Sequence, residues 1–555
     1  MLQQAWTFHA AGQLAQAQPI YEDILRKIPT QLDALHLLGA LSAQSRQWQT
    51  ALDLFNQALR LDQGNAQIFN NCGTVLQELG RFEEALNSYD KAIAVNAEYA
   101  DAYKNRGVVL RELQQFDASL QSFDKAILCK KYYADAYYSR GNLLQELRQF
   151  EAALNSFDSV LSIKPDHAQA YNNRGLVLEE LKQPAEALKS FEQALAINSN
   201  FFEAHYNRGN VLREFKQFSE VLQSYANAIA LKEDSAEVHW NKSLILLLTG
   251  DFQTGWREYE WRWRDEKNAI FKNKREFSKP LWLGAESLVN KSILLHSEQG
   301  FGDTIQFCRY ARMVADLGAT VILEVPPTLV NLITDLAGVA QLIAKGSATP
   351  HFDFHCPLMS LPLAFNTTEA MIPYGKEYLK PRLDKVEYWR SHIGDDGFKI
   401  GICWQGSTGK VDAGRSFPVN LLENISGIEG VRLISLQKNA GVEQLDNLPE
   451  GMKIETLPAD FDSGADAFLD SAAVLSCMDL VITSDTALTH LAGALDVRTW
   501  LALKEVPDWR WMLDRADSPW YPKHRLFRQT SKDDWSGVFA EMAAALKALI
   551  SGTTD

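Results

Sequence analysis

A glycine-containing stretch in the middle of the chain has the residue types for proton transfer beside an anion. Residues 297–306 read SEQGFGDTIQ. Gly300 and Gly302 would let a ligand come close to the backbone, and Asp303 stands where a helix is expected to begin. A carboxylate at that point could take a proton from a hydroxyl group. The same pattern fits a helix start that Asp303 merely caps, so both interpretations remain open at this point.

A second turn of similar character follows the apolar run 480–483, which predicts a strand. The turn consists of Ser484, Asp485, Thr486 and Ala487. Hydroxyls beside the free N–H groups of a helix start could hold a diphosphate without a metal ion. His490 lies four residues after Thr486 and would share its helix face, so we expect it to contact the ligand. The alternative is a simple N-cap cluster with a structural histidine.

The elements that must position these turns alternate between apolar runs and amphipathic segments from about residue 292 onward. This alternation is typical of a parallel sheet with crossover helices. One set of predicted strands comprises 292–296, 320–325, 339–343 and 352–356. The second set comprises 398–404, 431–436, 452–457, 480–483 and 498–503. We therefore expect two α/β units that meet near 385–397, with a ligand outside the carboxyl ends of the strands.

The first half of the chain is a repeat array with a period of 34 residues. The glycines that mark the period are Gly39, Gly73, Gly107, Gly141, Gly175 and Gly209. Small residues follow most of them after 12 and 19 positions, and an aromatic residue follows each after 16. Small residues would let two helices approach closely, and the aromatic side chain is expected to fill the gap to the next pair. The periodicity indicates a helical solenoid.

Asparagines recur two positions before the repeat glycines or their equivalents. They are Asn71, Asn105, Asn173, Asn207 and Asn241. An amide has both donors and an acceptor, so such a row can bind the backbone of an extended peptide. The alternative is bonding to the neighbouring turn. Beside this row run Arg106, Arg140, Arg174 and Arg208. We expect them to form salt bridges between repeats with the recurring Glu78, Glu112, Glu146, Glu180 and Glu214.

The array ends in the aromatic segment 255–264, which reads GWREYEWRWR. Trp256, Tyr259 and Trp263 would fall on one helical stripe. Such a stripe could be a platform for a carbohydrate, but packing between the last repeat and the following domain is the favoured interpretation.

The bulk composition excludes some classes of partner. The net charge of −15 and a pI near 5.3 argue against nucleic acid, because nucleic-acid affinity depends on clustered Lys and Arg. No apolar run approaches the roughly 20 residues of a membrane-spanning helix, and the first residues lack the pattern of a signal peptide. We expect no membrane insertion and a cytoplasmic location. The six cysteines have no metal-ligand spacing and are expected to be reduced, packed thiols.

Taken together, these motifs resemble known families. The 34-residue unit resembles the tetratricopeptide repeat, and the asparagine row resembles that of the eukaryotic O-GlcNAc transferase. The motif GFGD followed by DTALTHLAGAL resembles the bacterial heptosyltransferases, which are inverting glycosyltransferases of the GT-B fold. The segments QGFGDTIQF, FDFHCPLMSLP, VPDWRWMLDRADSPWYP and RLFRQ are similar to bacterial proteins in which tetratricopeptide repeats precede such a domain, and some of that group glycosylate flagellin.

The resemblance implies roles for individual residues. Asp303 corresponds to the catalytic base. The donor-phosphate turn corresponds to Asp485, Thr486 and Ala487, with alanine where the heptosyltransferases have glycine. Other residues expected at the nucleotide-sugar are Gly300, Gly302, Trp404, Gln405, Lys410, Arg415, Gln437, Lys438, Ser484 and His490. Residues 460–462 imitate a metal-binding DxD motif but precede a helix, so no metal and no cofactor besides the donor substrate are expected.

The predicted architecture is an all-α tetratricopeptide superhelix followed by an α/β GT-B glycosyltransferase with two Rossmann-like lobes. The boundaries are 1–269 for the array, 270–291 for a connector, 292–390 for an acceptor lobe and 391–555 for a nucleotide-sugar lobe. The array comprises a partial unit 1–31, six full repeats over 32–235 and a degenerate unit 236–269.

The expected activity is metal-independent, inverting sugar transfer from a nucleotide-sugar to Ser or Thr of a protein that the repeats hold. A flagellin-like protein is one acceptor that the resemblance allows. One alternative is a glycan or lipopolysaccharide acceptor, with the repeats serving assembly or self-association. The other is a non-catalytic repeat scaffold with a transferase-like domain.

Overall fold

The computed structural model describes residues 1–265, 275–373, 377–406, 414–464 and 467–552. The chain divides into two compact units, Met1–Lys232 and Glu233–Asp555. This division falls before the degenerate last repeat, which therefore belongs to the same unit as the two sheets.

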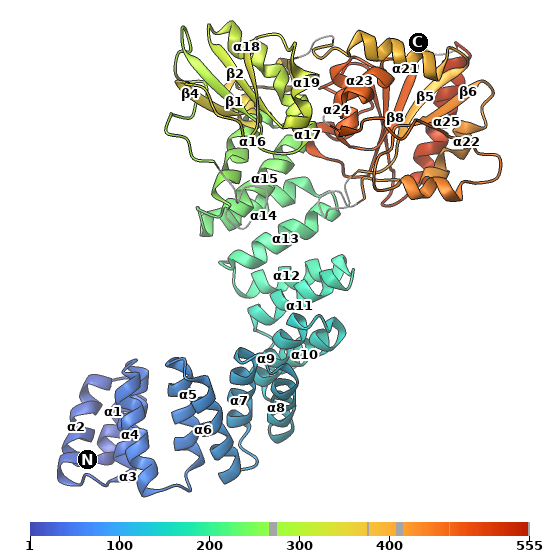
Figure 1. Ribbon diagram of the computed structural model, residues 1–555. Coiled ribbons are helices and arrows are strands. Elements are labelled where there is room, and N and C mark those ends of the chain that lie inside the picture. Colours follow the sequence, from blue (N-terminus) through green and yellow to red (C-terminus); the bar gives the residue numbers. More distant parts are fainter. Residues whose placement is uncertain (266–274, 374–376, 407–413, 465–466, 553–555) are drawn as a thin grey trace. The chain divides into compact units, whose positions relative to one another are not determined.

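The first unit is built from paired α-helices (Figure 1). Its helices are α1 (Leu2–Ala10), α2 (Leu14–Lys27), α3 (Leu32–Gln44), α4 (Trp48–Leu61), α5 (Ala66–Glu78), α6 (Phe82–Val95), α7 (Ala100–Glu112), α8 (Phe116–Cys129), α9 (Ala134–Glu146), α10 (Phe150–Ile163), α11 (Ala168–Glu180), α12 (Pro184–Ile197), α13 (Phe202–Glu214) and α14 (Phe218–Leu231).

The repeated glycine makes room for the repeated aromatic ring within the same helix pair. A Cβ atom added at Gly73 would lie 2.5 Å from the ring of Tyr89, and the six marker glycines all give values between 2.5 and 2.8 Å. The ring packs on the first helix of its own repeat because only glycine leaves space there. The ring also belongs to the same core cluster as residues of the next repeat, as Phe191 does with Val211, which agrees with the expectation that it fills the gap to the next pair.

Ion pairs connect neighbouring repeats, as predicted, but mostly with other carboxylates than those expected. Arg106 on α7 pairs with Asp90 on α6 at 2.7 Å and also donates to Ser122 on α8 at 2.7 Å. The same pairing recurs at Arg140, Arg174 and Arg208 with partners 16 residues earlier. Each arginine thus joins the second helix of one repeat to both helices of the next.

The second unit begins with the helical pair α15 (Ala236–Leu248) and α16 (Phe252–Tyr259), followed by the 3₁₀-helix η1 (Glu260–Arg264). Trp256 and Tyr259 are each only 1% exposed. The indole of Trp256 donates to the Thr367 carbonyl at 3.1 Å and meets the ring of Trp509 edge-on at 5.2 Å. These contacts bear out the packing interpretation of the aromatic stripe for these two residues.

Two parallel sheets follow. The four-stranded sheet has the order β3-β2-β1-β4 and the six-stranded sheet has the order β10-β9-β8-β5-β6-β7. Their strands are β1 (Ser292–His296), β2 (Thr320–Val325), β3 (Val339–Ala344), β4 (Phe354–Pro357), β5 (Phe398–Cys403), β6 (Val431–Ser435), β7 (Glu455–Thr456), β8 (Leu480–Thr483), β9 (Thr499–Leu503) and β10 (His524–Arg528). The central strands are buried apolar runs, as expected for parallel sheets covered on both faces.

Helices connect the strands, and one longer helix, α25, follows the last strand. Those with α geometry are α17 (Phe301–Phe307), α18 (Ala311–Asp316), α19 (Val330–Ile333), α20 (Leu361–Ala364), α21 (Leu383–Ile393), α22 (Glu423–Ser426), α23 (Leu469–Leu475), α24 (Ala487–Ala494) and α25 (Trp535–Ile550). The 3₁₀-helices are η2 (Cys308–Tyr310), η3 (Pro327–Leu329), η4 (Leu358–Ser360), η5 (Glu369–Met371), η7 (Val419–Leu422), η8 (Val442–Asn447) and η10 (Trp509–Trp511).

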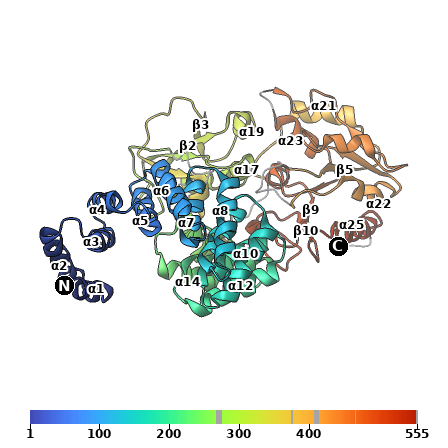
Figure 2. The same cartoon turned by 90° about the horizontal axis from the view of Figure 1, so that it is seen from below.

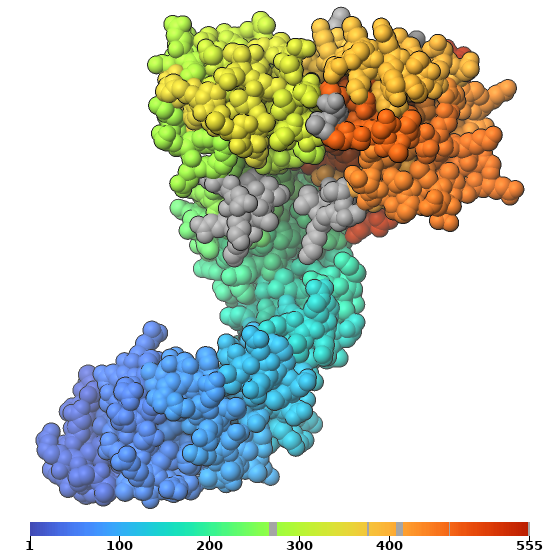
Figure 3. Space-filling model, in the orientation of Figure 1, coloured from blue at the N-terminus to red at the C-terminus, as the bar shows by residue number. Residues whose placement is uncertain are grey.

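Helix α25 lies beside β10 and closes the core of the six-stranded sheet (Figure 2). Its buried residues Phe539, Met542 and Leu546 share that core with Ile400 and Ile482 of the central strands. In the space-filling view the yellow part, with the four-stranded sheet, and the orange part, with the six-stranded sheet, meet along their common boundary (Figure 3). The candidate site lies where turns from the two sheets come together.

Candidate functional site

Asp303 lies in the first turn of α17, directly after the loop that leaves β1. Its Oδ2 accepts the N–H of Gly300, the N-cap residue, at 2.9 Å. The capping interpretation of this carboxylate is therefore correct for one oxygen. The other oxygen, Oδ1, receives a charged hydrogen bond from Nη2 of Arg510 at 2.5 Å. Asp303 thus combines a structural bond within its helix with an ion pair from η10.

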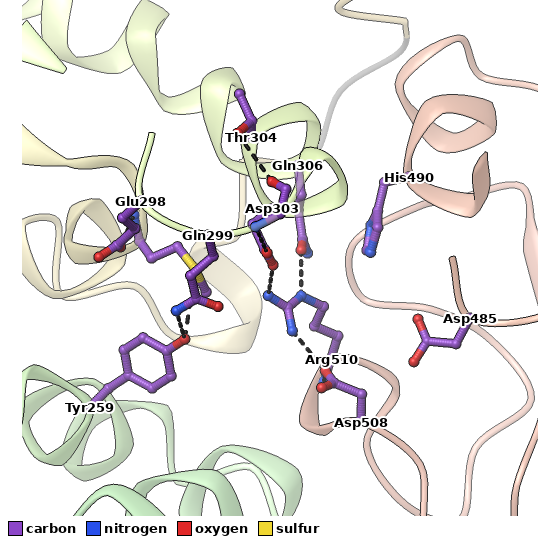
Figure 4. Close-up of polar contacts among 12 residues, drawn as sticks. Tyr259, Glu298, Gln299, Asp303, Thr304, Gln306, Asp485, His490, Asp508 and Arg510 are labelled. Atoms are coloured by element: carbon purple, nitrogen blue, oxygen red, sulfur yellow. Dashed lines mark hydrogen bonds and ion pairs between the residues drawn. The ribbon is translucent and has the colours of Figure 1, made fainter. Parts of the chain in front are cut away.

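Arg510 is the centre of this polar cluster (Figure 4). Its Nε donates to the Gln306 side-chain oxygen at 2.7 Å, and its Nη1 donates to Asp508 Oδ1 at 2.8 Å. The residue is 7% exposed. It therefore spans two residues of α17, Asp303 and Gln306, and the loop after β9 that carries Asp508. The three partners fix the plane of the guanidinium.

The carboxylates of the cluster differ in their electrostatic environment. Burial raises the pKa of Asp303, and the charge of Arg510 opposes that shift without cancelling it. At Asp508 burial also favours the neutral form, but Arg510 and Arg415 together hold its pKa below the usual value. Asp508 is therefore the most strongly ionised member, and Asp303 keeps part of the basicity that proton abstraction requires.

The second predicted turn lies at the carboxyl end of β8 and leads into α24. Asp485 is 8% exposed, and its Oδ2 lies 3.7 Å from Nε of Arg415. Burial raises the pKa of Asp485 despite that nearby charge. Arg415 also lies 3.5 Å from Asp508 Oδ2. The predicted pair Asp303 and Asp485 is thus joined through a chain of alternating charges.

Thr486 is the N-cap of α24, with an extended backbone, and its hydroxyl lies 3.5 Å from that of Thr483. Ala487 begins the helix. Ser484 is fully buried, and within the described part of the chain its hydroxyl has no hydrogen-bond partner. A buried hydroxyl without a partner is uncommon and fits a group that a ligand could engage.

His490 points toward the cluster from α24 (Figure 4). Its Nδ1 lies 2.8 Å from the Tyr521 hydroxyl, and its ring stacks on Trp511 at 5.6 Å. Burial, reinforced by Arg510, holds its pKa well below the usual value, so the ring is neutral. A Cβ atom at Gly302 would lie 2.7 Å from His490 Cδ2. Gly302 is therefore explained by the close approach of α17 and α24.

Gly300 has ordinary extended backbone angles, with φ −72° and ψ 176°, so its conformation does not demand glycine. An added Cβ would lie 3.3 Å from Asp303 Oδ2.

The residues predicted around the end of β5 form a braced junction. The Gln437 oxygen accepts the N–H groups of Trp404 and Gln405 at 3.0 Å each, and its NH₂ donates to the Gln405 and Ala440 carbonyls at 2.8 Å each. Trp404 is fully buried. Lys438 bonds to the Phe461 carbonyl. These side chains fix the loops at this edge, and Lys410 lies outside the described residues.

The asparagine row forms bonds between adjacent repeats. Asn105 donates to Asn70 and Asn207 donates to Asn172, each at 3.0 Å. Asn71 lies 3.0 Å from His36 Nε2, and Asn173 donates to Tyr138 and Asn142 at 3.2 and 2.9 Å. Asn241 lies on α15 in the second unit. Where the side chains are described, the row is half-buried rather than fully exposed.

The DxD-like segment is a structural turn. Asp462 accepts both the N–H and the hydroxyl of Ser471, at the start of α23. Among the described residues, no group of three or more His, Cys, Asp or Glu side chains is placed to hold a metal ion. The six cysteines are free thiols, four of them buried. Within the same residues no helix has the length and apolarity to cross a bilayer.

Sequence reasoning singled out neither Arg510, Asp508 nor Gln306. All three residues lie in segments that the sequence analysis quoted: Asp508 and Arg510 in VPDWRWMLDRADSPWYP, and Gln306 at the end of SEQGFGDTIQ. Nothing local indicated that the two segments meet, since Asp303 and Arg510 are 207 residues apart.

Comparison with known families supports the two-part organisation. Residues 2–66 and 138–201 match one tetratricopeptide repeat model, and residues 74–113 match a second repeat model. Residues 423–502 match glycosyltransferase family 9 (heptosyltransferase). The matched segment contains Gln437, Lys438, the Ser484–Ala487 turn and His490. The repeat prediction is confirmed, and a family of sugar-transferring enzymes is indicated for the segment that carries the second turn.

Among solved structures, the chain is similar to YrrB, described as a TPR protein with an unusual peptide-binding site (22% identity, 33% of this chain and 95% of that chain, TM-score 0.29). It is also similar to MamA (25% identity, 29% and 95%, TM-score 0.28). A third is a tetratricopeptide repeat protein from Parabacteroides merdae (20% identity, 44% and 97%, TM-score 0.35). No curated protein sequence matches the chain.

Proposed function

We propose that the protein is an inverting, metal-independent glycosyltransferase that moves a sugar from a nucleotide-sugar to a hydroxyl of a protein acceptor. The observation that carries this proposal is the meeting of Asp303 with the Asp485 turn in one buried, charged cluster. The turn belongs to the segment that matches glycosyltransferase family 9. In this proposal the four-stranded sheet belongs to the acceptor lobe and the six-stranded sheet to the donor lobe of a GT-B enzyme.

The chemistry requires a base and a site for the leaving group. The acceptor oxygen attacks the anomeric carbon and gives its proton to Asp303 Oδ1. The bond from the anomeric carbon to the phosphate oxygen breaks, and its electron pair leaves with the nucleoside diphosphate. A single displacement of this kind inverts the anomeric centre. A positioned carboxylate base contributes about 10² to 10⁴ in rate.

The leaving charge would be compensated at the second turn. The start of α24 presents N–H groups and the positive end of a helix dipole beside Thr486. Arg415 lies next to Asp485 and contributes a full positive charge. Lys410 is proposed for the same role from the sequence. Such groups act without a metal ion because they are already oriented toward the developing charge.

The proposed acceptor is a Ser or Thr in an extended segment bound by the asparagine row. The bonds from Asn105 to Asn70 and from Asn207 to Asn172 each use one amide hydrogen, whereas an amide has two. The inter-repeat bonds orient these amides and are compatible with peptide binding. A flagellin-like protein is one acceptor of this kind.

The decisive experiment is a thermal-shift screen of the full chain with the common nucleoside diphosphates and then with their sugars. A donor that binds the native state at 100 times its Kd raises stability by about 2.7 kcal/mol. Transfer or donor hydrolysis should then fall by about 10² to 10⁴ in Asp303→Asn, measured on a variant that remains folded. If no nucleotide binds, the non-catalytic scaffold is favoured. If glycans but no proteins accept the sugar, the repeats serve assembly.

A further inference from the structure

Asp303, the proposed base, is engaged on both of its oxygens. Oδ2 is held by the Gly300 N–H at 2.9 Å, and Oδ1 is held by Arg510 at 2.5 Å. The first bond lies within its own helix and fixes the side chain. The second comes from a separate element and occupies the oxygen that would receive the acceptor proton. A carboxylate paired this closely with a guanidinium is a weaker base than the same carboxylate alone.

Arg510 has a second anchor that does not depend on Asp303. Its Nη1 donates to Asp508 at 2.8 Å, and Asp508 Oδ2 lies 3.5 Å from Arg415. Arg415 in turn lies 3.7 Å from Asp485, beside the start of α24. The guanidinium of Arg510 thus lies between the base and the turn at which the donor phosphates are proposed to bind (Figure 4).

The charge balance of the cluster favours a change of partner when an anion enters. Three carboxylates, Asp303, Asp485 and Asp508, share the two guanidiniums of Arg415 and Arg510. A diphosphate placed beside them would be repelled unless the arginines turned toward it. Arg510 can do so while it keeps its bond to Asp508, and the bonds it must give up are those to Asp303 and Gln306, both on α17.

We propose that Arg510 is a positioning residue that holds Asp303 in the donor-free protein and moves to the diphosphate when the donor binds. This inference rests on the proposed glycosyl transfer at the same site. It predicts an order of events: the donor binds first, Asp303 becomes available as a base, and the acceptor follows. The donor-free protein would therefore not activate an acceptor hydroxyl.

The exchange of partners should change the number of protons that the protein takes up when the donor binds. When Arg510 leaves Asp303 and a phosphate charge comes near, both changes raise the pKa of that carboxyl, so binding should take up protons. Among the described residues, the other charged or titratable groups that face Asp303 are Asp508, Arg415, Glu298, Tyr259 and His490. Because these remain in an Asp303→Asn variant, the difference between the variant and the wild type isolates Asp303.

The experiment is titration calorimetry of the full chain with whichever nucleoside diphosphate gives the largest thermal shift, in buffers of different ionisation enthalpy between about pH 5 and pH 7. We expect the wild type to take up more protons than Asp303→Asn by a fraction of one, because Asp303 must stay largely ionised near pH 7 to act as a base. The same comparison between Arg510→Gln and the double variant Asp303→Asn/Arg510→Gln should give a smaller difference in proton uptake. The reason is that Asp303 has no guanidinium to lose when Arg510 is absent. Arg525→Gln, on β10 and 46% exposed, is the matched control and should behave as the wild type.

Three results separate the possibilities. Equal proton uptake in the wild type and Asp303→Asn would overturn this inference, because it would mean that Arg510 stays bound to Asp303. The proposed function would still stand. Failure of every nucleoside diphosphate to bind would overturn the proposed function and this inference with it. Since Arg510→Gln could lower stability, Arg510→Lys provides a second variant with the charge retained, and a nucleotide-bound structure should show the Arg510–Asp303 separation beyond about 4 Å.

Discussion

The side-chain amide of Gln299 donates a hydrogen bond to the Tyr259 hydroxyl at 3.0 Å. Tyr259 ends the last repeat helix, and Gln299 belongs to the loop that carries Asp303. Arg262, in the 3₁₀-helix η1 that follows, provides a second link, because it donates three hydrogen bonds to the Glu298 carboxylate and one to Ser360 Oγ. The degenerate last repeat is therefore part of the wall behind the candidate site.

The buried pair of Arg262 and Glu298 should be essential for the stability of the second unit. Arg262 is fully buried, and its Nη2 lies 3.0 Å from Glu298 Oε1. Removing one partner leaves the other buried without its countercharge, so Arg262→Ala should cost about 3 to 5 kcal/mol. Tryptophan fluorescence in urea measures this unit, because only Trp6 and Trp48 precede residue 233.

Arg257→Ala is the control for that measurement. Arg257 lies on α16 and is exposed, so its removal should change the unfolding free energy by no more than about 0.5 kcal/mol. An equal, small effect of the two substitutions would show that the last repeat is attached to the sheets only loosely.

Gly302 should be required for the contact between α17 and α24. An added Cβ would lie 2.7 Å from His490 Cδ2 and 3.4 Å from the Ala487 Cα atom. Gly302→Ala therefore forces the two helix starts apart and should cost about 1 to 3 kcal/mol. The melting temperature and the affinity for nucleotide should both fall. Gly427→Ala provides the comparison, since its nearest neighbour is 3.6 Å away, and it should be nearly neutral.

The sequence was sufficient for the strands with a continuous run of apolar residues at their centre. Strands β1, β2 and β8 occupy the predicted residues, because buried runs with clear ends leave little choice of boundary. Strand β10 was missed because His524–Arg528 interrupts its apolar residues with charged ones at a sheet edge. The predicted strand at 452–457 is reduced to Glu455–Thr456, an exposed edge.

The candidate site could be predicted only where its chemistry is local. Asp303 and Asp485 each stand at a strand-to-helix turn, and such turns leave a recognisable pattern. Arg510 has no comparable pattern, because its role arises from contacts that only the folded chain brings together. The same holds for Gln437, whose amide braces two loops instead of facing solvent.

The unfolding free energy of the second unit should depend on pH through His524. Burial lowers the pKa of this histidine to about 3. Its Nε2 lies 3.0 Å from the Thr489 carbonyl oxygen, a contact that opposes the effect of burial without cancelling it. Because the unfolded value is about 6.5, the unfolded chain binds the proton more tightly than the folded chain does. The stabilisation is complete above about pH 6.5 and is lost as the pH falls.

In the range from about pH 6 to pH 4, this one group should contribute a slope of about 1.4 kcal/mol per pH unit. His524→Gln should remove that contribution, whereas His351→Gln, whose side chain is 75% exposed, should leave the slope unchanged. Urea unfolding at several pH values measures the difference between the slopes. An unchanged slope in His524→Gln would show that His524 is protonated in the folded protein.

A recurrent backbone feature of the array allows a gain in stability. The turns between paired helices place a residue with positive φ every 34 residues, and glycine occupies positions 12 and 80, whereas Gln114 has φ 57°. A non-glycine residue in this region is strained by about 1 to 2 kcal/mol. Gln114→Gly should relieve this strain, while the greater freedom of glycine in the unfolded chain offsets part of the gain. We therefore expect a net stabilisation of the array of up to about 1 kcal/mol.

The neighbouring Gln115→Gly is the matched control, since Gln115 has φ −91° and gains nothing from glycine. It should lower stability by about 0.5 to 1 kcal/mol. Far-ultraviolet circular dichroism during thermal unfolding follows the helices of the array and should show opposite shifts of the melting temperature for the two variants. Shifts in the same direction would mean that the left-handed turn at Gln114 carries no strain that glycine can relieve.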